Sequence, residues 1–184
     1  MKNVRGFSII EMVIVIAISV IIMLSVIEIY ITYSNSYLYQ NAAINTSSSA
    51  AAFLNEFSDM SLQADAIVAS RTVSGTTYTT GSTTVVFEIP AINSSGDVVS
   101  NAYDYAILYA SSTGAYRLLD VNGSSVRVAG TKKFSDFVNN LTFTYDNGSP
   151  TAATSVTADI TTISLVKQET FSSHLKQQVY LRNK

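Results

Sequence analysis

The sequence predicts an α+β fold: one long N-terminal helix, membrane-spanning in its first half, packed by its second half on an antiparallel β-sheet. Three observations predict this fold. An apolar run from Met12 to Ile27 follows a short basic head. Residues 28–70 contain neither Pro nor Gly and carry apolar residues at helical spacing. After Arg71 the chain changes to short alternating stretches rich in Thr, Val and Tyr, separated by turn residues.

The N-terminal run is long enough to cross a bilayer. Residues 7–27 would span about 30 Å at a rise of about 1.5 Å per residue, which matches the hydrocarbon core. In lipid the backbone polar groups have to bond within the segment, so a single span must be a helix. Lys2 and Arg5 precede the run, and no Lys or Arg occurs between Gly6 and Ser70. The positive-inside rule therefore places the N-terminus in the cytoplasm and the rest of the chain outside.

Glu11 interrupts this run near its start. An ionised side chain in a membrane helix costs roughly 2.5–3.5 kcal/mol at the helix centre and usually has a functional partner. The plain alternative is a glutamate that reaches back to the headgroups. A cleaved signal peptide is the alternative for the whole run, with Ala17-Ile18-Ser19 as its cleavage site. The run continues past these residues and contains Glu11, and both features disfavour a signal peptide.

The stretch Gly6-Phe7-Ser8-Ile9-Ile10-Glu11 resembles the processing motif of type IV prepilins and type II secretion pseudopilins. That motif has Gly, Phe, Ser or Thr, two apolar residues and Glu, and the agreement continues through the hydrophobic stretch. The resemblance implies that residues 1–6 are a leader, which a prepilin peptidase removes after Gly6 before the new amine of Phe7 is methylated. Residues 7–29 would then be the transmembrane and polymerisation helix.

The resemblance also implies partners and a location. In a filament of staggered subunits, Glu11 of one subunit can meet the Phe7 amine of its neighbour, and their attraction is much stronger in a low-dielectric core than in water. Glu11 is therefore expected to be an assembly latch. The implied partners are other pilin or pseudopilin subunits, the prepilin peptidase, assembly-platform membrane proteins and the lipid bilayer. The implied location is the inner (cytoplasmic) membrane, followed by a pilus or pseudopilus filament.

Residues 30–70 are predicted to continue the helix as an amphipathic segment, to about Ala69. An apolar stripe at spacings of three and four residues marks the face that would cover a sheet: Ala50, Phe53, Phe57, Met60, Ala64 and Ile67. The Ser-rich patch at residues 46–49 is the place where the helix is expected to loosen. Glu28 stands where major pilins commonly have a kinking Pro, so no sharp bend is expected there.

Residues 71–184 are predicted to form the antiparallel sheet domain. The expected strands lie at residues 83–89, 104–109, 116–121, 124–128, 141–145, 158–166 and 178–181, the last with room to extend upstream. Asn122-Gly123 predicts a tight type I′ hairpin turn between the third and fourth of these strands. Neighbouring tyrosines are interpreted as sheet packing rather than a ligand grip: Tyr103, Tyr105, Tyr109 and Tyr116.

The later strands resemble J-type minor pseudopilins and W-type minor pilins at residues 137–146 and 179–183. This resemblance implies a minor, tip-associated subunit, with a major pilin as the main alternative. The chain has no Cys, so it departs from the many major pilins that close a C-terminal loop with a disulfide.

The sequence supports no enzyme, cofactor or metal site. Its single histidine, His174, lies in a polar stretch, and no nucleophile elbow, phosphate loop or metal-spaced cluster occurs. Residues 93–97, Asn-Ser-Ser-Gly-Asp, are the one stretch with some likeness to a calcium loop. With 11 Lys+Arg against 13 Asp+Glu, the chain lacks a basic footprint for nucleic acid.

Two functional alternatives remain open beside the filament subunit. One is a membrane-anchored binding or adhesion module that does not polymerise. The other is a competence-type pilin that binds DNA through Arg127, Lys132 and Lys133, although DNA is an unlikely partner on charge.

Overall fold

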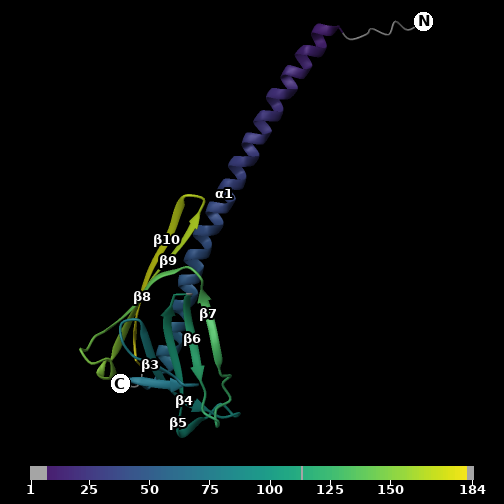
Figure 1. Ribbon diagram of the computed structural model, residues 1–184. Helices are drawn as coiled ribbons and strands as arrows, with labels where there is room; N and C mark the ends of the chain where they lie inside the picture. The colour runs from purple at the N-terminus through teal and green to yellow at the C-terminus, as the bar shows by residue number, and fades with distance from the viewer. Residues whose placement is uncertain (1–7, 113, 182–184) are drawn as a thin grey trace. The chain divides into compact units, whose positions relative to one another are not determined.

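The computed structural model describes residues 8–112 and 114–181 (Figure 1). The chain divides into two compact units, with the division after Asn41, and helix α1 (Ile9–Gln63) contributes to both. The strands are β1 (Ala66–Ile67), β2 (Ser70–Val73), β3 (Thr76–Thr79), β4 (Thr84–Ile92), β5 (Val98–Ser111), β6 (Gly114–Asp120), β7 (Gly130–Ser135), β8 (Val138–Tyr145), β9 (Ser155–Val166) and β10 (Glu169–Tyr180). A short 3₁₀ helix, η1 (Pro150–Ala152), precedes β9. The predicted α+β class is confirmed.

In the second unit, α1 buries one stripe of side chains against the sheets. Its buried residues recur at spacings of one to four: Ala42, Thr46, Ala50, Phe53, Leu54, Phe57 and Ser61. The Phe57 ring lies 6.1 Å from that of Phe87 on β4 and 5.9 Å from that of Phe143 on β8. The Phe53 ring meets that of Phe134 on β7 at 5.9 Å. The predicted apolar stripe is thus the centre of the core.

The helix runs without a break through the Ser-rich patch at residues 46–49, so the predicted loosening there is wrong. The Thr46 hydroxyl lies 3.1 Å from the Ala42 carbonyl oxygen and 3.0 Å from that of Ala43, and the Ser48 hydroxyl donates to Asn45. A Ser or Thr hydroxyl inside a helix can donate its hydrogen bond to a backbone carbonyl of the preceding turn. The patch therefore costs the helix little.

The helix ends at Gln63, earlier than the predicted end near Ala69. The Asp65 N–H donates to the Glu88 carbonyl at 2.9 Å, and β1 then pairs with β4. Ala64 and Ile67 are buried as the stripe predicted, but they reach the core from a loop and a strand. Pairing with the edge of β4 gives this segment backbone hydrogen bonds that the last helical turn would leave unmade.

Two antiparallel sheets share the core. The larger has the order β1-β4-β5-β6-β7 and the smaller the order β10-β9-β8. They are joined through β8, where the Phe143 N–H donates to the Ser82 carbonyl at 2.7 Å and the Tyr145 hydroxyl donates to the Gly81 carbonyl at 2.9 Å. Burial raises the pKa of Tyr145, so its hydroxyl stays a donor at any physiological pH.

The β2–β3 hairpin, which the sequence did not predict, lies on the other face of the larger sheet. The Arg71 guanidinium bonds Asp120 on β6 at 2.8 Å and stands 4.0 Å from the ring centre of Tyr105. The Tyr109 ring lies 5.1 Å from that of Tyr78 on β3 and 5.4 Å from that of Tyr116. Burial, with the neighbouring Tyr78 hydroxyl, raises the pKa of Tyr109 to about 12. Tyr105, Tyr109 and Tyr116 therefore pack on the sheet, as predicted.

Most predicted strands are present, with longer extents. β5, β8 and β9 contain the stretches predicted around them, and β4 contains all but the first residue of its stretch. β10 contains all but the last residue of its stretch and extends far upstream of residue 178. β4 continues past Pro90, where the register with β5 shifts. Proline is tolerated at such an irregularity because no ladder N–H is needed there.

The predicted hairpin at Asn122-Gly123 is wrong. β6 pairs with β7, and residues 121–129 form a loop instead of a strand after a tight turn. The Asn122 side-chain oxygen accepts the Ser124 N–H at 2.9 Å, and its carbonyl accepts the Ser125 N–H at 2.9 Å. Gly123 does not adopt the positive φ that a type I′ turn requires.

A buried carboxylate explains this loop. Asp104 on β5 is fully buried, and its Oδ2 bonds the Ser125 hydroxyl and Arg127 Nη1, each at 2.7 Å. Its Oδ1 accepts the Asn122 N–H at 2.8 Å. Arg127 also donates to the Pro90 carbonyl at 2.6 Å. A buried charge needs partners, and the segment that supplies them cannot also pair as a strand.

The Arg127→Met substitution tests this interaction. It leaves Asp104 buried without its cation, so the free energy of unfolding should fall by about 3–5 kcal/mol. The matched control is Lys133→Met, because Lys133 pairs with Asp136 on the surface and its loss should leave stability unchanged. Urea unfolding of the full chain in detergent measures both. Equal losses of unfolding free energy in the two variants would show that the buried Asp104–Arg127 pair contributes no more to stability than the surface pair.

A glycine pair tests the turn assignment. Gly114 has a φ of +140°, and an added Cβ would overlap the Ser135 carbonyl oxygen, whereas nothing lies within 4 Å of a Cβ at Gly123. Gly114→Ala should therefore lower the free energy of unfolding by about 2 kcal/mol or more, and Gly123→Ala should change it by less than about 0.5 kcal/mol. Thermal unfolding of the full chain reports both, and a large loss at Gly123 would restore the hairpin interpretation.

Candidate assembly site

The predicted site residues lie at the start of α1. Gly6 and Phe7 fall outside the described residues, which begin with Ser8. Glu11 lies in the first turn of the helix. The structure thus describes the last four residues of the predicted processing motif, Ser8 to Glu11, including its ionisable residue.

Ser8 and Glu11 cap the helix N-terminus together. The Ser8 N–H donates to Glu11 Oε2 at 2.8 Å, and the Ser8 hydroxyl oxygen accepts the Ile10 N–H at 3.2 Å. The first N–H groups of a helix have no intrahelical partner, and a Ser-x-x-Glu pair satisfies them. The negative charge of Glu11 is also favoured by the positive end of the helix dipole.

Sequence reasoning missed this cap, although the spacing of Ser8 and Glu11 is its known signature. Glu11 therefore has a partner inside its own chain. A carboxylate has two oxygens and several acceptor positions, so one bond to Ser8 leaves capacity for a cation from elsewhere.

The helix surface that follows is apolar on all sides. In the part of the chain that the structure describes, α1 is the one helix long and apolar enough to cross a membrane, and none of its most apolar window is buried. Large apolar side chains are exposed throughout: Ile9, Ile10, Met12, Val13, Ile14, Val15, Ile16, Ile18, Val20, Ile21, Ile22, Met23, Leu24, Val26, Ile27, Ile29 and Ile31. A helix that is apolar all round needs lipid or other helices around it.

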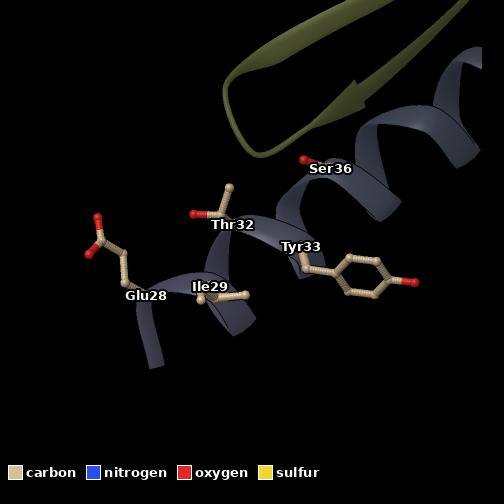
Figure 2. Close-up of a pocket in the computed structure, with 5 residues that line it drawn as sticks. All are labelled: Glu28, Ile29, Thr32, Tyr33 and Ser36. Atoms are coloured by element: carbon tan, nitrogen blue, oxygen red, sulfur yellow. The ribbon is translucent and has the colours of Figure 1, made fainter. Parts of the chain in front are cut away.

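A second acid, Glu28, follows this surface. Glu28, Ile29, Thr32, Tyr33 and Ser36 line a shallow hollow along α1 (Figure 2). The hollow is shaped by a single helix, so it offers no enclosed site for a small ligand. Its polar side chains mark the end of the uninterrupted apolar run.

The remaining candidates have structural roles. His174 Nε2 lies 2.7 Å from Asp159 Oδ1 on the exposed surface of β9 and β10. The side-chain oxygen of Asn93 accepts the N–H groups of Ser95 and Asp97 at 2.9 and 3.0 Å, so the calcium-like stretch is a turn closed by its own atoms. No cluster of three or more metal-ligating side chains occurs within residues 8–112 and 114–181.

The three cations of the DNA-binding alternative are each paired. Arg127 holds the buried Asp104, Lys132 Nζ lies 3.1 Å from Glu56 Oε2, and Lys133 contacts Asp136. Glu56 also lies 3.3 Å from Arg117 Nε. Paired cations make a weak attraction for phosphates, so the geometry does not favour DNA binding.

In comparison with protein families, residues 1–27 match the family described as the prokaryotic N-terminal methylation motif. Comparisons with curated proteins and with solved structures found no match. The matched motif and the long apolar helix together support a subunit of the type IV pilin and pseudopilin family and its anchoring in a membrane. The motif points to a structural rather than a catalytic protein.

Proposed function

We propose that this chain is a structural subunit of a type IV pilus or pseudopilus, cleaved after Gly6 by a prepilin peptidase and assembled through its N-terminal helix. The observation that carries the proposal is the methylation motif of residues 1–27, which includes the exposed apolar first part of α1. Residues 1–6 are the leader, residues 7–29 span the inner membrane with the N-terminus in the cytoplasm, residues 30–70 lead into the folded domain, and residues 71–184 form the sheet domain outside.

We further propose a minor or tip position for the subunit. The strand patterns at residues 137–146 and 179–183 support it, since they resemble those of J-type minor pseudopilins and W-type minor pilins. The absence of cysteine, and hence of a C-terminal disulfide, agrees with this position.

The proposed latch uses the geometry at Glu11. In a separate subunit, the bond from the Ser8 N–H holds the carboxylate against the helix N-terminus. In a filament, the Phe7 amine of a neighbouring subunit binds the same carboxylate in a medium where charge attraction is strong. Neutralising Glu11 in this way removes the cost of an unpaired charge among apolar helices. A membrane-anchored module that does not polymerise is the competing function, and it has no use for this pairing.

The processing step predicts a defined N-terminus. Mass spectrometry of the mature protein should find Phe7 first and methylated. Gly6→Leu should leave the leader attached, because a bulky side chain blocks the close approach that Gly allows. An N-terminus at Val20 would instead indicate an ordinary signal peptidase and would overturn the proposal.

The latch predicts that the charge of Glu11, rather than its cap, controls assembly. Glu11→Gln keeps an oxygen for the Ser8 N–H but removes the charge, and Glu11→Val removes both. Both variants should be processed and inserted in the membrane, while filament yield falls by more than about tenfold, the equivalent of about 1.4 kcal/mol.

Ser8→Ala is the matched control, because it removes the capping hydroxyl and keeps the charge. Its filament yield should stay close to that of the parent. Filaments sheared from cells and counted by immunoblot give the readout. If Glu11→Gln assembles as well as the parent, Glu11 is not a charge latch. The competing function, a membrane-anchored module that does not polymerise, would then be the better supported one.

A further inference from the structure

We propose that Tyr30 and Tyr33 of α1 dock in the lipid headgroup layer at the outer edge of the membrane span and fix the depth and rotation of the helix there. The inference rests on the membrane anchoring proposed above and goes beyond it, because anchoring alone requires no particular face of the helix. The occupant of this tyrosine face is the bilayer interface, not a protein.

Tyr30, Tyr33 and Tyr37 form one face of the helix. Their spacing of three and four residues brings their side chains together on the surface. Tyr30 and Tyr33 are each 71% exposed and Tyr37 is 61% exposed. Within the unit that contains them they are therefore not core residues.

A polar stripe lies on the other side. Glu28, Thr32 and Ser36 follow one another at intervals of four residues, so they share a line along the helix. Figure 2 shows the Tyr33 ring on one side of the helix and the side chains of Glu28 and Thr32 on the other. This segment is thus two-sided, unlike the apolar run before it.

The position of the tyrosines along the helix matches the interface. From Ile9 to Ile27 the helix rises about 27 Å, close to the hydrocarbon thickness of about 30 Å. Tyr30 begins about one turn beyond that run. Long side chains in a helix point back toward its N-terminus, so the ring of Tyr33 reaches toward the membrane. Tyr37 lies about 15 Å beyond Ile27 and continues the same face outside the headgroup layer.

The chemistry of the two faces decides the orientation. A tyrosine ring is apolar and its hydroxyl is polar, and such side chains gather where headgroups meet hydrocarbon. Glu28 stands at the edge of the hydrocarbon, where its carboxylate has to face water. Turning the polar stripe to water turns the tyrosine face to lipid. The tyrosine face is continuous with the apolar span, so both of them contact the lipid bilayer.

The chain contains no Trp, so a single introduced Trp is the only indole reporter. We would reconstitute the full chain in phosphatidylcholine–phosphatidylglycerol vesicles at high lipid excess. The variants are Tyr30→Trp, Tyr33→Trp and Thr32→Trp, with Val20→Trp for the middle of the span. Fluorescence quenching by shallow and deep brominated lipids and by aqueous iodide reports the position of each indole.

Thr32 lies between Tyr30 and Tyr33 along the helix axis. If depth alone determined quenching, Thr32→Trp would therefore give a value between those of Tyr30→Trp and Tyr33→Trp. We expect shallow lipid labels to quench Tyr30→Trp and Tyr33→Trp several-fold more than Thr32→Trp, and iodide to show the reverse order. Replacing Tyr30 and Tyr33 by Ser in the Thr32→Trp background should abolish this protection from lipid labels, because the helix is then free to rotate.

Equal quenching of the three variants would overturn the proposal. So would shielding of Tyr33→Trp from iodide that disappears as lipid excess rises, since a neighbouring protein would then be covering the face. If Val20→Trp is not quenched by deep labels, the span itself is not in the bilayer. That outcome would remove the anchoring on which the proposal rests and is distinguishable from failure of the tyrosine face alone.

Discussion

The structure depends on how one helix, α1, covers its apolar surface. Between residues 9 and 31 the apolar side chains are exposed on every side, whereas between residues 42 and 61 the buried side chains form one stripe. Burial is worth roughly 25 cal/mol per Å² in both cases, but the first segment needs an apolar surrounding and the second needs only a sheet. The sheet domain can therefore complete its own core, while the first unit depends on a membrane or on other subunits.

The cap at the start of the helix bears on how Glu11 could act. A capping interaction of this kind is worth about 1 kcal/mol, which is too little to hold a charge in lipid unaided. Its value lies in direction, because the Ser8 N–H fixes where the carboxylate points. Under the proposed assembly, a neighbour's amine meets an oriented acceptor instead of a freely rotating one. Cap and latch are then successive uses of one carboxylate, and the first prepares the second.

The sequence predicted the features that depend on local pattern. The apolar run, the helical stripe around Phe53 and Phe57 and most strands follow from periodicity, and the structure confirms them. The errors arose where a distant residue decides. Asp104 draws in Asn122, Ser125 and Arg127, and a bond to Glu88 ends the helix at Gln63. For the site, the Ser8–Glu11 spacing is itself a sequence signal for a helix cap, so local pattern was sufficient to predict it.

The charges of the sheet domain limit how it can meet a partner. Arg71, Arg117 and Arg127 each form an ion pair with an acid of the second unit, and Asp104 is fully buried beneath its cation. Charges used in this way fix loops and hairpins but give little long-range attraction, since each is neutralised at contact distance. Recognition of this domain by neighbouring subunits would then depend on shape and on its hydroxyl-rich surface. That suits a filament, where the apolar helices supply the affinity and the outer domains need only fit.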